Sequence, residues 1–395
     1  MKHTSSIILS ATLQIAVLLC VSAKADDAAL RPFAEVRTLA AIQNGLTHGQ
    51  SSGLRVQRVI IRSISKKFVS APPEIWSDNR NAAAAIRFLL SGGDPAFGRN
   101  PAVREALPQA YRQLFTAAMA FTQGQRAAAR RLLADIDPRK LLPVVGGHVA
   151  LVSGILLSSS DPAKAQRRLE DARLLGSGTL VEEAALRRQV EVAVAVREFN
   201  RFRSVADTYI RHYQKSVYAG VFRQSFSRNV LIVLEAGNKP RVDWLVKFLK
   251  RVRKEQRQPY YTAIAREAVL RGRSDIVAPI TELGLEVAGR EGEASAQLTL
   301  YQSAMSIFAG GVGKSEETLS AINVERLSRH DAAIHQAASS LVRRIEGWPK
   351  STMAGPPPPP NAKATLARKM RVRPLEEILE VGRVKLAAAT ELLAQ

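Results

Sequence analysis

Hydrophobic residues recur every three or four positions along almost the whole chain, with polar residues between them. This spacing predicts amphipathic helices, and the alternating β-branched runs expected of strands are nearly absent. Ala, Leu, Arg, Glu and Gln, which favour helices, dominate most segments. The pattern therefore predicts an all-α protein. The predicted helices cover 31–47, 51–69, 79–91, 101–107, 108–123, 125–136, 144–158, 162–175, 180–197, 200–214, 218–236, 241–254, 260–271, 274–288, 294–309, 315–324 and 327–347.

Local start and stop signals support these helices. "FLLSGGDP" (88–95) predicts a helix end at the glycine pair, because the proline that follows cannot continue a helix. Asp161 before Pro162 predicts an N-cap with proline at the first helical position. Thr179 and Glu182 have the spacing of a capping box. These signals predict local structure and no chemistry.

Short helices with short connections predict stacked helical hairpins. The segment "AMAFTQGQRAAARRLLADIDP" (118–138) resembles a tetratricopeptide-type hairpin, in which Gly124 ends the first helix and Ala128 packs inside the second. A related segment aligns Leu169 with Leu132. A tetratricopeptide-like α-solenoid and an irregular helical array both fit this pattern. Either architecture builds extended surfaces that bind proteins.

The first 25 residues have the features of a secretory signal peptide. They combine a basic start, an apolar run over 7–21 and a small-residue pattern that predicts cleavage between Ala25 and Asp26. The predicted location is therefore the periplasm, without a transmembrane span after processing. Cys20, the only cysteine, is removed with the signal, so the mature chain has no disulfide or thiol chemistry.

Composition divides the mature chain into three parts. Residues 26–347 form the predicted helical-array domain. Residues 348–374 contain five consecutive prolines and a basic cluster, which predicts a stiff linker. Residues 375–395 predict one amphipathic helix. An isolated helix of that length is marginal in water, so it is expected to dock on its own domain or on a partner.

The chain is strongly basic, with a net charge of +22 that falls to +20 without the two lysines of residues 1–25. For an exported protein this charge favours acidic protein surfaces or an anionic envelope surface over nucleic acid, and the alternative is a basic proteome that tolerates arginine on solvated faces. The densest positive charge lies in 241–261, beside an apolar stripe. It is the candidate partner-binding surface, and the alternative is a solvated helix face with Trp244 and Phe248 packed on neighbouring hairpins. The six cations are Lys247, Lys250, Arg251, Arg253, Lys254 and Arg257.

The sequence contains no convincing catalytic, metal or cofactor site. "SIFAGGVGKSEETLS" (306–320) ends like a P-loop, but Phe308 stands where the first glycine is required. The segment instead predicts a helix end at the glycine pair and an N-cap at Ser315. His330 and His335 are five residues apart, which does not suit a metal pair on one helical face. His148 beside two glycines favours a structural role.

Several long phrases resemble the MotC-type periplasmic motility proteins of alphaproteobacteria. They occupy 76–95, 147–190 and 202–226, and the likeness spans most of 30–345. The resemblance implies a non-enzymatic role in chemotaxis and flagellar rotation. It also implies that the protein acts on the periplasmic part of the stator subunit MotB. Through this contact it would help to set the state of the proton channel that MotB forms with MotA. A general cell-envelope scaffold that binds peptidoglycan or its machinery, and a helical cell-wall lytic enzyme, are the alternatives.

Overall fold

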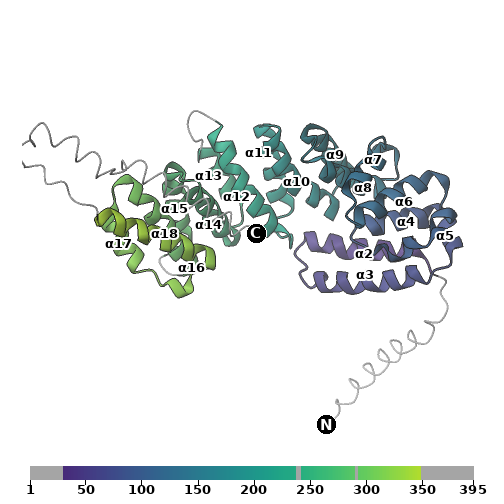
Figure 1. The fold of residues 1–395 in the computed structure, drawn as a ribbon, viewed down its shortest axis with the longest axis horizontal. Coiled ribbons are helices and arrows are strands. Elements are labelled where there is room, and N and C mark those ends of the chain that lie inside the picture. The colour runs from purple at the N-terminus through teal and green to yellow at the C-terminus, as the bar shows by residue number, and fades with distance from the viewer. Residues whose placement is uncertain (1–29, 237–241, 290–291, 348–395) are drawn as a thin grey trace, which may run out of the picture. The chain divides into compact units, whose positions relative to one another are not determined.

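The computed structural model describes residues 30–236, 242–289 and 292–347. All regular secondary structure in these ranges is helical (Figure 1), which confirms the predicted all-α fold. The α-helices are α2 (Pro32–Thr47), α3 (Gly53–Val69), α4 (Asn79–Leu90), α5 (Pro101–Ala106), α6 (Gln109–Thr122), α7 (Arg126–Leu133), α8 (Pro143–Leu157), α9 (Pro162–Leu175), α10 (Leu180–Ala195), α11 (Phe199–His212), α12 (Ala219–Glu235), α13 (Val242–Arg251), α14 (Lys254–Leu270), α15 (Ser274–Ala288), α16 (Glu293–Ser306), α17 (Val312–Ser320) and α18 (Arg329–Glu346). Short 3₁₀ helices are η1 (Pro73–Ser77), η2 (Pro95–Arg99), η3 (Pro138–Lys140), η4 (Ile307–Ala309) and η5 (Val324–Arg326).

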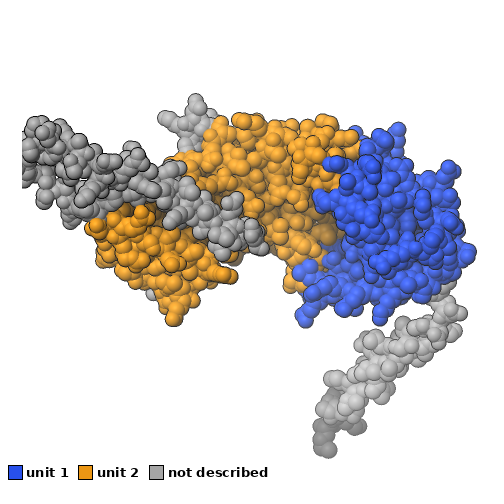
Figure 2. Space-filling view, viewed as in Figure 1, with its two compact units in different colours: residues 1–43, 52–149 blue, residues 44–51, 150–395 orange. Residues whose placement is uncertain are grey.

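The described chain divides into two compact units (Figure 2). Unit 1 contains the described residues up to 43 and residues 52–149, and unit 2 contains residues 44–51 and those from 150 onward. The sequence did not predict this division. The predicted signal peptide, the proline-rich linker and the final amphipathic helix lie outside the described residues, so they stay predictions.

Aromatic side chains form the centre of unit 1. The ring of Phe68 from α3 lies 5.0 Å, centroid to centroid, from both Trp76 and Phe88, and Phe97 continues the cluster to Phe115 of α6 at 5.9 Å. The alanine run of α4, Ala82–Ala85, is buried throughout. Small side chains on more than one side let other elements approach α4 closely, so this helix lies inside the unit rather than on its surface.

Helices that follow one another in sequence pack together in unit 2. The pairs α9 and α10, α10 and α11, α14 and α15, and α15 and α16 are neighbours, and α12 bridges from α10 to α14. A row of stacked rings links α11, α12 and α13: Tyr209 lies 3.7 Å from Phe222, and Phe226 lies 4.5 Å from Phe248. This is the helical array that the hairpin pattern predicts.

Most local signals have the predicted effect. Asp161 accepts a hydrogen bond from Lys164 N at the start of α9, and Thr179 accepts one from Val181 N at the start of α10. Gly124 has a φ of +76° between α6 and α7, a conformation that glycine adopts without strain. In that hairpin, however, Ala129 is the fully buried residue and Ala128 is half-buried. The predicted packing was therefore one residue out of register.

Two predicted helix starts are wrong. The helix predicted from 260 begins at Lys254 and includes Pro259 in its second turn. Gln214 satisfies the backbone on both sides of the preceding break, because its amide donates to Arg251 O and accepts from Arg253 N. Ser315 does not cap α17, which begins at Val312. Its hydroxyl instead donates to Gly311 O over 2.7 Å within the helix.

Candidate functional site

The six predicted cations lie around the junction between α13 and α14. Lys247, Lys250 and Arg251 belong to the second half of α13, and Lys254 and Arg257 to the start of α14. Arg253 lies in the break between the two helices. Five of the six are exposed, and Arg257 is half-buried. The short connection therefore gathers these cations into one region of unit 2, which we call the junction surface.

Two of these cations already have partners within the protein. Arg251 forms an ion pair with Asp207 of α11 at 3.0 Å. Arg257 donates to the carbonyl oxygens of Lys250 and Val252, at 3.0 and 3.1 Å. Carbonyls at the end of a helix have no intrahelical donor, so Arg257 satisfies the end of α13. These two arginines stabilise the junction and are not free for a partner.

The other four cations form no ion pair with a described residue. Lys247, Lys250, Arg253 and Lys254 are exposed, and Glu255 is the acidic residue beside them in the first turn of α14. Lys254 stands at the amino end of α14, where the helix dipole disfavours positive charge, so helix stability does not explain its presence.

The aromatic residues of the segment pack inward. Phe248 is fully buried, and Trp244 is half-buried against Phe202 and Phe226, with ring centroids 6.2 and 6.3 Å apart. The Arg203 guanidinium lies 5.3 Å from the Trp244 ring centre. These aromatics therefore anchor α13, as the solvated-face interpretation expected, and only the charged face is open to solvent.

Unit 1 carries a second basic surface that the sequence analysis missed. The helix α3 has no acidic residue, and it exposes Arg55, Arg58, Arg62 and Lys66 together with Val59, which is 55% exposed. Lys67 pairs with Glu35 at 2.5 Å. The hydrophobic period of α3 predicted its existence but not its orientation, because only Ile64, Ser65 and Phe68 are buried.

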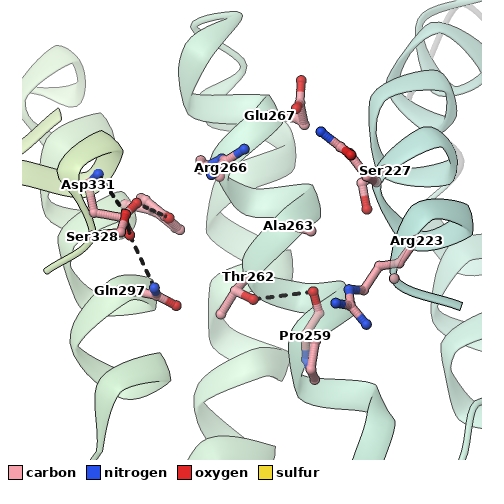
Figure 3. Close-up of a pocket in the computed structure, with 13 residues that line it drawn as sticks. Arg223, Ser227, Pro259, Thr262, Ala263, Arg266, Glu267, Gln297, Ser328 and Asp331 are labelled. Carbon is pink, nitrogen blue, oxygen red and sulfur yellow. Dashed lines mark hydrogen bonds between the residues drawn. The ribbon is translucent and has the colours of Figure 1, made fainter. Parts of the chain in front are cut away.

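A cavity of about 470 Å³ lies within unit 2, among α12, α14, α16 and the start of α18 (Figure 3). Buried Asp331 is in its wall and accepts hydrogen bonds from Tyr301 Oη, Gln297 Nε2 and Ser328 Oγ at 2.5, 3.1 and 2.7 Å. Burial and this carboxylate both raise the pKa of Tyr301. The lining residues come from positions 220–331, so no local sequence motif marks the cavity.

The histidines do not form a metal site in the described residues, where no group of three or more His, Cys, Asp and Glu side chains has suitable geometry. His335 contacts Leu319 O at 2.8 Å, whereas His330 is exposed. Burial lowers the pKa of His148 to about 4, helped by the Arg87 charge, and its Nδ1 lies 3.1 Å from Val144 O. None of the described helices is long and apolar enough to cross a membrane.

Comparison with known proteins then places this helical array in a family. The family model of the chemotaxis protein MotC matches residues 1–395. The chain belongs to the MotC family. One relative, the chemotaxis protein MotC of Rhizobium meliloti (strain 1021), is 25% identical over 364 residues, which cover 92% of this chain and 83% of the relative. No solved structure matches the chain significantly.

Family membership gives this protein a role connected with motility. The MotC name is that of a chemotaxis and motility protein and not that of an enzyme family.

Proposed function

We propose that this protein acts in the periplasm, where it binds the periplasmic part of a MotB-type stator subunit and modulates flagellar rotation. The match of the MotC family over the whole chain carries this proposal. The signal-peptide features of residues 1–25, with cleavage between Ala25 and Asp26, support the location. The mature chain needs no cofactor and no nucleic acid for this role.

The junction surface is the proposed contact. It offers four exposed positive charges, on Lys247, Lys250, Arg253 and Lys254. Lys247 and Lys250 lie on α13, which is held in place by its buried side, including Phe248. Charges on a packed helix are presented in a fixed arrangement, which favours a specific partner over diffuse attraction. An acidic patch on the stator subunit would complement them.

Modulation of the motor requires a preference for one state of the stator. A ligand that binds the open and closed channel states equally shifts neither population. A difference of about tenfold in affinity moves the equilibrium by about 1.4 kcal/mol. We therefore propose that the junction surface fits the periplasmic part of MotB in only one of its two channel states.

A binding titration tests the proposal. Residues 26–395 are mixed with the periplasmic region of MotB from the same organism, at about 50 mM and about 300 mM salt. We expect saturable binding that weakens at the higher salt, because exposed charges are screened. No binding at tens of micromolar at low salt would contradict the proposal and favour the envelope-scaffold alternative.

Two variants with equal loss of charge locate the contact. In the first, Lys247, Lys250, Arg253 and Lys254 are replaced by glutamine. In the second, the replaced residues are Arg55, Arg58, Arg62 and Lys66, which α3 exposes. The first variant is expected to weaken binding at least about tenfold and the second less than about threefold. Equal losses would mean that net charge alone drives binding, and a larger loss in the second would move the contact to α3.

A further inference from the structure

The cavity among α12, α14, α16 and α18 has an unusual charge balance. Two acidic residues line it: Asp331 is buried and receives three side-chain hydrogen bonds, so its carboxylate is already satisfied, whereas the Glu267 side chain forms no hydrogen bond or ion pair with a described residue. Two arginines, Arg223 of α12 and Arg266 of α14, line the same cavity. Neither forms a hydrogen bond or an ion pair with any residue that the structure describes. Among the charged side chains of the lining without such a partner, two are therefore positive and one, Glu267, is negative.

Both arginines are half-buried, and that raises the cost of leaving them unpaired. Arg223 lies 5.9 Å from the centre of the Tyr260 ring, and its side chain extends from α12 towards α14 in Figure 3. The charge of Arg266 opposes the rise in the pKa of Tyr301, and the Tyr301 hydroxyl donates a hydrogen bond to Asp331. A partly desolvated guanidinium gains most from a carboxylate, which it binds through two parallel hydrogen bonds.

The rest of the lining suits a polypeptide. Gln224, Thr262 and Ser328 provide amide and hydroxyl groups along the walls, and Pro259 and Ala263 provide short apolar surface. Ser227 is 1% exposed, and its hydroxyl has no hydrogen-bond partner among the described residues. A cavity of about 470 Å³ holds a few side chains and lies in the range of ligand-binding sites.

We infer that this cavity binds an acidic polypeptide segment, whose carboxylates pair with Arg223 and Arg266. Glu267, also half-buried at the cavity without a described ion pair, leaves one net positive charge among the uncommitted side chains. The site therefore prefers an acidic segment over a basic one, but it also tolerates a neighbouring amide or amine. This inference does not depend on the identity of the stator partner, because it concerns a different surface from the junction surface.

The test uses fluorescein-labelled hexaglutamate and the purified protein, with hexaglutamine as the neutral control and free glutamate as a competitor. Fluorescence anisotropy at low salt is expected to show saturable binding of hexaglutamate. The double variant Arg223→Gln, Arg266→Gln is expected to weaken this binding at least about tenfold. Arg228→Gln removes an exposed charge from the same helix α12 and is expected to change the affinity less than about threefold.

A second readout on the wild-type protein covers the case in which the double variant does not fold. Phenylglyoxal modifies accessible guanidinium groups, and mass spectrometry locates the products. Hexaglutamate is expected to protect Arg223 and Arg266 and to leave Arg228 unprotected. Equal protection of all three arginines, equal binding of hexaglutamine, or equal affinity of the double variant would overturn the inference. If free glutamate displaces hexaglutamate at the same carboxylate concentration, the cavity binds single carboxylates rather than a polypeptide, and the inference is wrong.

Discussion

At the scale of single residues, His148 makes stability depend on pH. Burial lowers its pKa from 6.5 to about 4, so the folded protein keeps it neutral where the unfolded chain binds a proton. Stability is therefore fully present above pH 6.5 and falls as the pH drops from about 6.5 to about 4. Urea unfolding measures the free energy of unfolding at pH 7 and pH 5. Between these two pH values it is expected to fall by about 1–2 kcal/mol less in His148→Gln than in the wild type. The exposed His212→Gln is the control, and an identical pH dependence of both variants would contradict the prediction.

Glu183 is a second residue whose effect can be predicted. It is fully buried in α10 and accepts hydrogen bonds from Arg187 Nε, Tyr209 Oη and Ser216 Oγ at 3.0, 2.7 and 3.2 Å. Glu183→Gln leaves the Arg187 charge without its carboxylate and is expected to lower the free energy of unfolding by about 3 kcal/mol.

The neighbouring Glu182 is the control for that substitution. It is half-buried and accepts from Gly178 N and Tyr213 Oη, both at 2.8 Å. A glutamine there keeps an acceptor oxygen, so Glu182→Gln is expected to lose less than about 1 kcal/mol. Similar losses in urea unfolding of the two variants would show that the Glu183 network does not hold a buried charge.

At the scale of helices, Gly284 marks a point in unit 2 where three helices approach closely. A Cβ atom at this position of α15 would lie 2.8 Å from Leu298 Cδ1 of α16 and 2.9 Å from Tyr261 Cβ of α14. Gly284→Ala is therefore expected to destabilise the protein by about 1–2 kcal/mol, although alanine favours helices. Gly313→Ala in α17 meets no atom within 4 Å and is expected to stabilise by about 0.5–1 kcal/mol. If thermal unfolding shows both variants stabilised, the three helices do not meet at Gly284 as described.

The helices also show what the sequence could predict. Their spans follow from hydrophobic period and from caps such as Asp161, because both signals act within a few residues. The break between α13 and α14 could not be predicted, since the side chain of Gln214, more than 30 residues earlier, satisfies its backbone. The ion pair between Arg251 and Asp207 and the lining of the cavity also join residues that are far apart in sequence. Contacts distant in sequence leave no local pattern, so the charged segment was predictable and its pairing was not.

At the scale of the whole molecule, the two compact units are expected to unfold separately. Each has its own core, and Trp76 and Trp244 contact the aromatic cores of units 1 and 2. Chains of this length commonly depart from two-state unfolding. With Trp348 replaced by phenylalanine, two further variants each keep one of these tryptophans. Their fluorescence in urea is expected to give two transitions with different midpoints.

The Glu183→Gln substitution sharpens this prediction because Glu183 belongs to unit 2. It is expected to lower the urea midpoint reported by Trp244 by an amount that matches a loss of about 3 kcal/mol, and to leave the midpoint reported by Trp76 nearly unchanged. In unit 1 the reciprocal change is Phe88→Ala, which removes a fully buried ring 5.0 Å from Phe68 and is expected to lower only the Trp76 midpoint. If either substitution moves both midpoints equally, the chain unfolds as one cooperative unit, and a partner bound to one unit would then stabilise the whole protein rather than that unit alone.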